Sequence, residues 1–453
     1  MTLSQDQESR AYIALNRFGL GAKPDSIQRI GKNAKAALEE ELNTPGIALI
    51  NRPNLPNYNQ ACQIIHTDFN KENGNKEREL TARLSKHLQP HIGFVERLVL
   101  FFSNHFSMSI NKDGAIRATI GQLERDVIRK HVLGSFRSML LGVMQHPAMI
   151  RYLDNDDSIG PASPAGQNWG AGLNQNLARE ILELHSMGVG GGYTEKDIDA
   201  LSRVISGWSF VRGWEADGHY NGGYKSNRGR FIFRKDWHEP GAQKILGKRY
   251  GAPGLQQGED VLTDLARHPS TAQYIAFKLV RHFITDAPTP AMVEPLALAY
   301  RQSKGSLKAV AQALIDLPEA WSLPLTKLRR PYELQVAQMR ALERTYDADR
   351  IWSFNSTLSA LRNLPWEYGT PDGFPDESPY WMGPDAMRIR LETAQMCAST
   401  LMQVAPVRRS PTLIANQIFG SNLSLKSRSA IAQAIDQRHG LATLFMIPEF
   451  QRR

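Results

Sequence analysis

The segment from Asn174 to Trp208 contains the densest group of chemically reactive side chains in the sequence. Spacings of three and four residues place four of them on one face of a helix: Asn176, Arg179, Glu180 and Glu183. Two carboxyl groups one turn apart are typical of acid–base chemistry, because burial or a nearby like charge raises one pKa while the other group stays ionised. We therefore predict that Glu183 or Glu180 acts as a general acid or base. Arg179 and Asn176 would orient it.

A second interpretation of this face involves no reaction. Arg179 would neutralise Glu183 across one turn of an exposed helix, a contact worth roughly a few tenths of a kcal/mol. His185 projects from the opposite side with Leu177 and Ile181, so we expect it to be packed in the core or to interact with the helix C-terminus. A metal site made from Glu183 and His185 is unfavourable, because the two side chains point in nearly opposite directions.

The glycine-rich turn that follows is expected to connect two helices. Gly188 is placed to end the first helix in the left-handed conformation, and Thr194 with Asp197 resembles a capping box for the next helix. The glycines at 190–192 would let the backbone approach a ligand closely. However, the sequence has neither GxxxxGK[ST] nor a strand-borne GxGxxG, so a structural turn is favoured over a phosphate-binding loop.

Other polar and aromatic residues are candidates to line a substrate cleft. Asn104 and His105 follow an apolar helical run, and His238 lies in the segment DWHEPG, which is expected to form a turn. The proline-rich block 365–384 alternates aromatic residues with acids, which suits sugar stacking and hydrogen bonding to hydroxyl groups. A rigid loop that covers the core would have a similar composition. The predicted substrate-binding residues are His105, Asn104, His238, Trp366, Asp376 and Trp381.

No cofactor is predicted for the acid–base site, and no metal site is favoured. The alternative is a metal-dependent enzyme that holds a divalent metal with imidazole and carboxylate ligands. Its ligands would be His105, His185, His238 and Glu183. Because these residues are far apart in the sequence, the alternative requires the fold to bring them to one point.

Apolar residues recur at helical spacing through most of the chain, so we predict a mainly α fold with a multi-helix globular body. The exception is the segment in which RFIF and KILGKRY flank DWHEPG, where a small inserted β-hairpin is expected near 230–250. Proline-rich breaks separate the helical blocks without long linkers. We expect one large helical domain over 1–453, or two interlocked halves, 1–208 and 258–453, joined by a β-containing insertion at 209–257.

The composition is that of a soluble globular protein, with 453 residues of which 42% are hydrophobic and 22% charged. A net charge of +9 suits a polyanionic partner such as a polysaccharide. Specific nucleic-acid binding is not expected, because no helix-turn-helix, zinc-finger or stacking motif accompanies the charge. The two cysteines, Cys62 and Cys397, are too few for a disulfide framework.

Neither an export signal nor a transmembrane segment is visible in the sequence. The N-terminus has no basic start followed by an apolar run, and no stretch of about 18 apolar residues occurs. A cytoplasmic location is therefore the default expectation.

Several blocks of the sequence, taken in order, resemble the bacterial family called domain of unknown function 1800. They are RFGLGAKP, SNHFS, NLAREILELHSMGVGGGYTEKDIDALSRVISGW, FRKDWHEPGAQKILG, HPSTAQYIAFKLVRHF, PDGFPDESPYW and PEFQRR. The resemblance covers essentially the whole chain, and the NLARE block is its most specific part. It implies a predominantly helical protein. Many members are exported and encoded beside sulfatase-like hydrolases, so the resemblance also implies export and a partner of that kind.

The sequence departs from the family pattern at three points. It shows no export signal, it has GGG where an acid usually precedes GGY, and it has HEPG where HDxG is usual. The last change places Glu239 beside His238 and puts the part of His238 in a shared site in doubt. The family name records no activity, so the resemblance implies no particular reaction. It does favour a functional role for Glu180 or Glu183, which lie inside a recurrent block.

Three functional hypotheses follow from the sequence. The first is a helical hydrolase that acts on a carbohydrate or a similarly hydroxylated substrate with a helix-borne glutamate as general acid or base. The second is the metal-dependent enzyme described above. The third is a non-catalytic scaffold or polyanion-binding protein, whose binding would weaken sharply with salt.

Overall fold

The structure is a computed structural model that describes residues 3–212, 215, 227–344, 351–404 and 409–453. Within these ranges most residues are helical, and the strands are short. The predicted mainly α fold is therefore confirmed. None of the helices in these ranges combines the length and the apolar character needed to cross a membrane.

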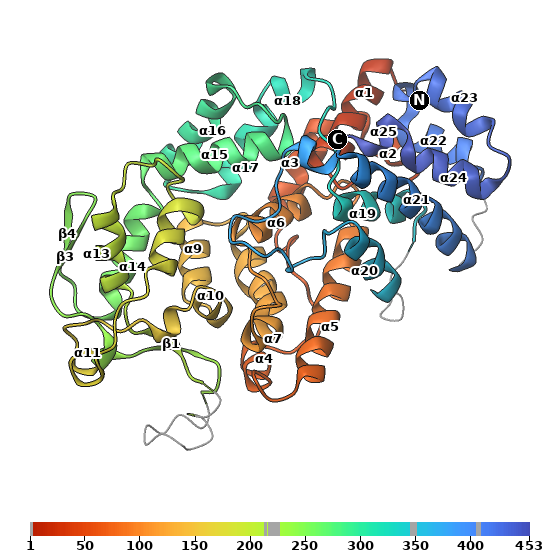
Figure 1. Ribbon diagram of the computed structural model, residues 1–453. Coiled ribbons are helices and arrows are strands. Elements are labelled where there is room, and N and C mark those ends of the chain that lie inside the picture. The colour runs from red at the N-terminus through yellow and green to blue at the C-terminus, as the bar shows by residue number, and fades with distance from the viewer. Residues whose placement is uncertain (1–2, 213–214, 216–226, 345–350, 405–408) are drawn as a thin grey trace.

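The helices that precede the first strand run from the end of the molecule that holds the N-terminus through its middle to the opposite side, where α11 and α13 lie (Figure 1). In chain order they are α1 (Gln5–Ile13), α2 (Ser26–Ile30), α3 (Ala34–Asn43), α4 (Tyr58–Gln63), α5 (Phe69–Leu88), α6 (Phe94–His105), α7 (Gly114–Leu123), α8 (Arg129–His131), α9 (Phe136–Met144), α10 (Pro147–Tyr152), α11 (Pro164–Trp169), α12 (Asn176–Glu180) and α13 (Glu195–Val204). Three π-helical segments and one 3-10 segment continue or connect them: η1 (Ala14–Phe18), η2 (Glu124–Ile128), η4 (Ile181–His185) and η3 (Asn155–Asp157).

The helices that follow the strands begin beside α9 and α13 and return to the beginning of the chain, where α22 packs on α2 (Figure 1). They are α14 (Leu255–Leu265), α15 (Pro269–Phe283), α16 (Pro290–Gln302), α17 (Leu307–Asp316), α18 (Glu319–Ser322), α19 (Pro331–Ala341), α20 (Ile351–Ala360), α21 (Pro384–Val404), α22 (Pro411–Phe419), α23 (Leu425–Ala432), α24 (Gln437–Met446) and α25 (Pro448–Gln451). The 3-10 segments of this part are η6 (Lys235–Trp237), η8 (Ser378–Trp381) and η9 (Gly420–Asn422). Helix α15 packs on α16, α16 packs on α17, and α21 packs on α24.

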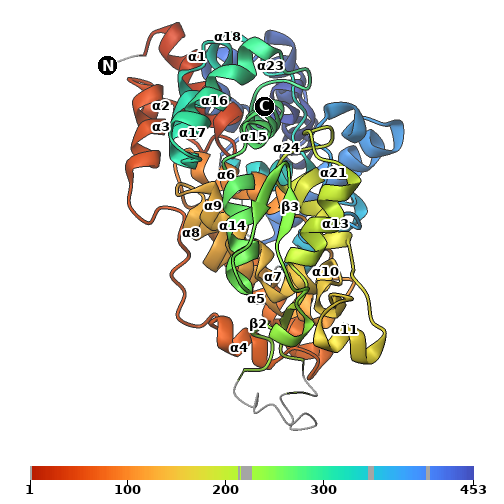
Figure 2. The ribbon, with the colours of Figure 1, turned by 90° about the vertical axis from the view of Figure 1, so that its left-hand side faces the viewer.

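The strands form two separate antiparallel pairs. β1 (Trp208–Phe210) pairs with β2 (Phe231–Phe233), and β3 (Gln243–Ile245) pairs with β4 (Lys248–Tyr250). The hairpin expected near 230–250 is confirmed as β3 and β4, which lie beside α13 and α14 (Figure 2). Its turn is Leu246–Gly247, both at positive φ, as a tight two-residue hairpin requires.

One detail of the strand prediction is wrong. RFIF and KILGKRY do not pair with each other across DWHEPG, because RFIF pairs with the strand at Trp208–Phe210. The DWHEPG segment instead contains η6 and connects the two strand pairs. The partner strand lies far back in the sequence, so no local turn signal could indicate it. Residues 213–214 and 216–226 of the predicted insertion lie outside the described part of the chain.

The two ends of the chain pack together at one end of the molecule (Figure 1). Tyr12 of α1 meets Phe419 of α22 edge to face at 6.0 Å. The Ser421 amide of η9 donates to Glu8 at 2.9 Å. The largest hydrophobic cluster accordingly includes residues from Ala11 to Phe450. Whether the chain is one domain or two interlocked halves stays a prediction.

A pair of Gly–Ser steps joins helices from both parts of the chain. Ser135 caps α9 and Ser306 caps α17, each by accepting a hydrogen bond from a backbone amide of the first turn. The Phe136 amide donates to the Gly305 carbonyl at 2.9 Å, and the Leu307 amide donates to the Gly134 carbonyl at 2.8 Å. Two helix starts are therefore tied to each other by reciprocal backbone hydrogen bonds.

Many arginines lie inside the protein and donate hydrogen bonds to backbone carbonyl groups. Arg17, buried beside η1, donates to three carbonyls around α18, those of Ala320, Leu323 and Pro324. Arg340 of α19 donates to the carbonyls of Gly21, His87, Pro90, His91 and Ile92. A guanidinium group has five N–H donors in a fixed plane, so one side chain can satisfy several loop carbonyls. Part of the positive charge of the chain is thus structural.

Candidate functional site

Helix α12 ends at Glu180 and continues without a break into the π-helical turn η4. Leu177, Ile181 and His185 form its buried side, whereas Glu180 and Glu183 stay partly exposed. Single π turns inside helices occur frequently at functional sites. This turn places the imidazole in the core and both carboxylates on the outer side, as the helical wheel predicted.

Arg179 interacts with two carboxylates. Its Nη1 atom lies 3.3 Å from Glu183 and 2.9 Å from Glu195, and Nη2 donates to Glu195 at 2.8 Å. The ion pair between Arg179 and Glu183, expected under the second interpretation, is present. Glu195 shares the guanidinium group of Arg179. Only part of the positive charge of Arg179 therefore acts on the carboxylates of α12 and η4. Asn176 lies exposed at the start of α12.

Glu180 combines a raised pKa with an enclosed carboxyl oxygen that has no partner in the described part of the chain. Burial raises the pKa of its carboxyl to about 7, and the negative charges of Glu183 and Asp372 add to this effect, while Arg179 offsets only part of it. One of its oxygens, Oε2, is enclosed and has no hydrogen-bond partner among the described residues. A carboxyl that is half-buried, unpaired and protonated near neutral pH is suited to transfer a proton.

A structural carboxylate in this protein shows the contrast. Glu96 is buried in α6 and accepts a hydrogen bond from Arg129 at 2.9 Å. Burial alone would raise its pKa, but the charges of Arg129 and His87 hold the pKa of Glu96 at about 2. Glu96 therefore has a buried cationic partner, whereas Oε2 of Glu180 has no hydrogen-bond partner among the described residues.

Asp372 brings a third carboxylate to Glu180 from a distant loop. Burial raises the pKa of Tyr152 to about 12, and the charges of Glu180 and Asp372 contribute to that rise. Burial likewise raises the pKa of Tyr274 to about 12, again with contributions from Asp372 and Glu180. The two carboxylates therefore face the same phenol groups. We call the following residues the Glu180 cluster: Tyr152, Glu180, Glu183, Tyr193, Tyr274 and Asp372.

The loop that carries Asp372 is fixed by Asn104 at the end of α6. The Asn104 side chain donates to the Phe374 carbonyl and accepts from the Phe374 amide, both at 2.9 Å. Gly373 has φ +80°, and a Cβ atom there would lie 2.4 Å from the Asn104 carbonyl oxygen. Asn104, predicted to contact substrate, is placed as the anchor of this loop.

His105 and His185 hold two helix ends together beneath the cluster. The Nε2 atom of His105 lies 3.2 Å from the carbonyl oxygen of His185, and Nδ1 of His185 lies 3.2 Å from the carbonyl oxygen of His105. A carbonyl only accepts, so each of these ring nitrogens carries the proton. Each imidazole thus satisfies a carbonyl at the C-terminal end of the other helix, where intrahelical partners are missing.

Lys278 of α15 completes this buried polar chain. Its ammonium group donates to His105 Nδ1 at 3.1 Å, the nitrogen that is left unprotonated. Burial lowers the pKa of Lys278 to about 8, although Asp376 and Asp372 act in the opposite direction. Lys278 is only partly enclosed, and it faces Asp372 from the side of α15. The cluster therefore has a cation next to its carboxylates.

The remaining predicted residues lie outside the Glu180 cluster. The Nδ1 atom of His238 lies 3.2 Å from the Ser206 carbonyl, and the ring packs against Phe233. Asp376 pairs with His282 at 2.8 Å. Trp381 and Trp366 are buried in the protein. Their roles as substrate contacts stay predictions, and the proposal below does not use them.

The ligands of the metal-site alternative do not converge. The rings of His105 and His185 are 6.0 Å apart, and each uses one nitrogen on the other's carbonyl group. His238 is engaged with Ser206 on a different element. In the described part of the chain, no group of three or more His, Cys, Asp or Glu side chains is arranged to hold a metal ion. The set His105, His185, His238 and Glu183 is therefore not supported as a site.

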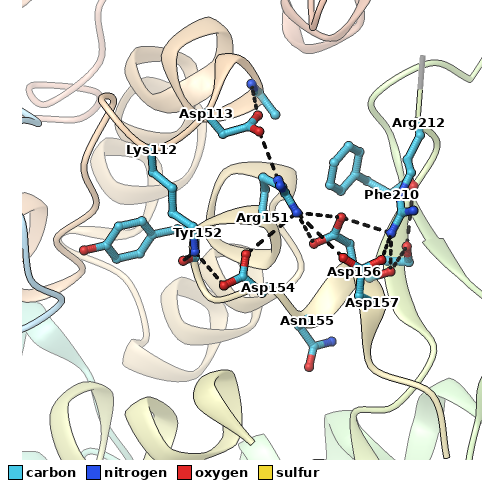
Figure 3. A network of polar contacts seen from close by, with 12 residues as sticks. Lys112, Asp113, Arg151, Tyr152, Asp154, Asn155, Asp156, Asp157, Phe210 and Arg212 are labelled. Carbon is cyan, nitrogen blue, oxygen red and sulfur yellow. Dashed lines mark hydrogen bonds and ion pairs between the residues drawn. The ribbon is translucent and has the colours of Figure 1, made fainter. Parts of the chain in front are cut away.

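A second dense polar network surrounds Arg151 of α10 (Figure 3). Arg151 donates to Asp113 at 3.0 Å and contacts Asp154 at 3.7 Å and Asp156 at 3.4 Å. Arg212, which follows β1, contacts Asp156 at 3.3 Å. Each of these carboxylates has a cationic partner. The network ties the start of α7 to α10, η3 and β1, which is a structural role.

Asp113 is expected to be the most important carboxylate of the Arg151 network for stability. It caps α7 by accepting from the Ala115 amide at 2.7 Å, and it also contacts His66 and Arg151. Asp113→Ala removes the cap and the charged contacts, so we expect the free energy of unfolding to fall by about 2 kcal/mol. Asp113→Asn retains a good cap and should lower the free energy of unfolding by about half as much. Urea denaturation of both variants measures the difference, and equal losses would contradict a capping role.

Five residues near Glu180 were not among the predicted site residues: Tyr152, Tyr193, Tyr274, Lys278 and Asp372. A signal for two of them exists in the sequence, because Tyr274 and Lys278 are four residues apart and share one face of α15. Asp372 stands in a Pro–Asp–Gly turn that resembles many ordinary turns. Only the fold shows that it lies near enough to Glu180 to raise the pKa of that carboxyl.

Comparison with known proteins gives one match. A family model described as "Protein of unknown function (DUF1800)" matches residues 13–452, a span that includes all of the Glu180 cluster. No curated protein and no solved structure matches the chain.

Proposed function

For a chain that belongs to the DUF1800 family of proteins of unknown function, we propose a hydrolase that acts on a carbohydrate or a similarly hydroxylated substrate, with Glu180 as the general acid–base group. The observation that carries this proposal is the carboxyl of Glu180, which is half-buried and unpaired and has a pKa raised by burial to about 7. Two further carboxylates, Glu183 and Asp372, lie close enough to contribute to that shift. Paired carboxyl groups with separated pKa values are the usual means of glycoside hydrolysis.

The proposed reaction uses Glu180 in its protonated form. It donates its proton to the leaving-group oxygen as the bond between carbon and that oxygen breaks. A water molecule attacks the carbon and gives one proton to the carboxylate of Glu183. Arg179 contacts Glu183 at 3.3 Å and orients its carboxylate. Transfer of the water-derived proton back to Glu180 restores the starting state.

The surroundings of Glu180 support a hydroxylated substrate. Tyr193 and Tyr274 are partly exposed and lie next to the carboxylates, as their pKa values show: burial raises both, and the charge of Glu180 adds to each. Phenol rings offer an apolar face for a sugar ring and a hydroxyl group for hydrogen bonding. Lys278 adds a donor beside Asp372.

The direct test is a substrate screen with two variants. Wild-type protein, Glu180→Gln and Glu183→Gln are incubated with a panel of 4-nitrophenyl glycosides and with soluble polysaccharides, and release of nitrophenol or reducing ends is measured. We expect at least one substrate that the wild type cleaves and Glu180→Gln does not. Activity that persists unchanged in Glu180→Gln would overturn the assignment.

The pH dependence of this activity gives a second test. If Glu180 donates a proton, kcat/KM should fall as the pH rises above about 7, because the acid is then ionised. Asp372→Asn removes a negative charge that helps to raise the pKa of Glu180. The pH at which kcat/KM begins to fall should therefore be lower in this variant. An unchanged pH would show that another group controls the profile.

The polyanion-binding alternative has less support. It rests on the net charge of +9, but several arginines, Arg17 and Arg340 among them, are buried and donate to backbone carbonyls. Such groups add to the formal charge without forming a basic surface. A partner that resembles a sulfatase-like hydrolase stays a prediction from the family resemblance.

A further inference from the structure

A small cavity lies between α5, α6, α19 and the loop that leads to Asp372. Its volume is about 50 Å³, and its walls include Arg83, Ser107, Arg330 and Trp366. One water molecule needs about 10–15 Å³ of such space, so a small ion fits together with water. The cavity is separate from the Glu180 cluster but shares the loop of residues 366–374 with it.

Arg83 is the main charged group on the cavity wall. Its side chain is only 6% exposed, and its guanidinium group lies between two aromatic rings, 5.0 Å from Tyr332 and 5.1 Å from Trp366. Its Nε atom forms an ion pair with Glu124 at 3.3 Å, whereas Nη1 has no hydrogen-bond partner among the described residues. Stacking occupies the two faces of a guanidinium group and leaves the in-plane N–H donors of Nη1 free to bind an anion.

Trp366 contributes a second free donor to the same cavity. Its indole nitrogen Nε1 is buried and has no hydrogen-bond partner among the described residues. An indole N–H only donates. A buried donor without a partner costs about 1–3 kcal/mol, so two such groups on one small cavity are unfavourable unless something accepts from them.

The one carboxylate on the cavity wall is already saturated. Glu333 contacts Arg453 at 2.7 Å, Arg330 at 3.5 Å and Arg97 at 3.6 Å. None of its oxygens is among the unpaired buried atoms, and among the described residues of this wall the unpaired side-chain atoms are all donors. Arg330 adds a second cation from the same side. The free chemistry of the cavity is therefore that of a receptor for negative charge.

We propose that this cavity binds a small monovalent inorganic anion of the size of chloride or bromide, held by the free N–H donors of Arg83 and Trp366. Arg330 supplies further positive charge, and ordered water fills the remaining space. The anion connects α5 to the loop that carries Asp372, because Trp366 and Phe374 both belong to the cavity wall.

Crystals grown in sodium bromide test this proposal by anomalous scattering. We expect a bromide peak between Arg83 and Trp366 in the wild-type protein. Trp366→Phe keeps an aromatic ring next to Arg83 but removes the N–H donor together with part of the indole, so the peak should weaken or disappear. A cavity that holds water alone in bromide-grown wild-type crystals would overturn the proposal.

Thermal unfolding in solution provides an independent measurement. At equal ionic strength, the wild type should unfold at a temperature on the order of 2 °C higher in sodium bromide than in sodium gluconate, whose anion is too large for the cavity. Trp366→Phe should lose most of this difference. Trp169→Phe, which changes an exposed tryptophan on α11, should keep it. The same bromide effect in all three proteins would show that the anion acts elsewhere.

Discussion

Glu180→Gln should lower kcat by about 10²- to 10⁴-fold on any substrate that the wild type cleaves, the usual contribution of a general acid or base. The same variant should be at least as stable as the wild type at pH 8. The pKa of Glu180 is about 7 in the folded protein, raised by burial from an ordinary value of 4.5. The folded state thus binds this proton more tightly than the unfolded state, and the carboxyl costs stability once the pH has passed through both values. Glutamine is neutral and avoids that cost.

The comparison across pH separates a functional role from a structural one. Wild type and Glu180→Gln should differ in thermal midpoint above pH 7, and the difference should vanish below about pH 4, where the carboxyl is protonated in both states. Glu392→Gln, in the exposed ion pair with Arg388 on α21, is the matched control and should change neither activity nor midpoint. A clear loss of stability in Glu180→Gln at pH 8 would contradict the assignment.

Glu333→Gln should destabilise the protein by about 3–5 kcal/mol, the effect of removing one partner of a buried ion pair. Glu333 is 1% exposed and serves three arginines: Arg97, Arg330 and Arg453. Burial alone would raise the pKa of Glu333, but these three charges hold it well below its usual value. Glutamine has almost the same shape and leaves three guanidinium groups without their shared anion.

Chemical denaturation at several pH values measures this effect. Because the folded pKa of Glu333 is lowered, its contribution is present above the unfolded value of 4.5 and is lost as the pH falls toward the folded value. The difference in the free energy of unfolding between wild type and Glu333→Gln should therefore become smaller at acidic pH. Glu343→Gln, in the exposed pair with Arg409, should unfold like the wild type. If Glu333→Gln lowers the free energy of unfolding by less than about 1 kcal/mol, the three arginines have found other partners.

Much of the fold was predictable because its signals are local. Apolar residues at helical spacing predict the helices, and capping residues predict their ends. Gly188 does adopt positive φ at 81°, and Thr194 with Asp197 does form a capping box. The partner of β2 was not predictable, because the strand at Trp208–Phe210 lies more than twenty residues earlier and carries no turn signal toward it.

Only the part of the candidate site that lies on a single helix was predictable from the sequence. The wheel separates Glu180 and Glu183 from His185, and that separation is present in the structure. The contribution of Asp372 depends on a loop placed by Asn104, almost 270 residues before it in the chain. The interior arginines show the same limit, since composition counts their charge but does not reveal that it is buried. A large basic excess in a sequence is therefore weak support for a polyanionic partner.

The π-helical turn at Ile181–His185 is the last turn of the helix that begins with α12, and Ser186 after it is no longer helical. A π turn closes its hydrogen bonds over five residues instead of four, so it contains one residue more than an α turn does. Removal of one residue from this turn would restore the α pattern, with four residues in place of five. Glu180 precedes the turn and would keep its place, while the spacing from Glu180 to His185 would shorten by one residue. The length of this turn is therefore as informative as its side chains, and a gap at this point in an alignment would mark a different arrangement of the site.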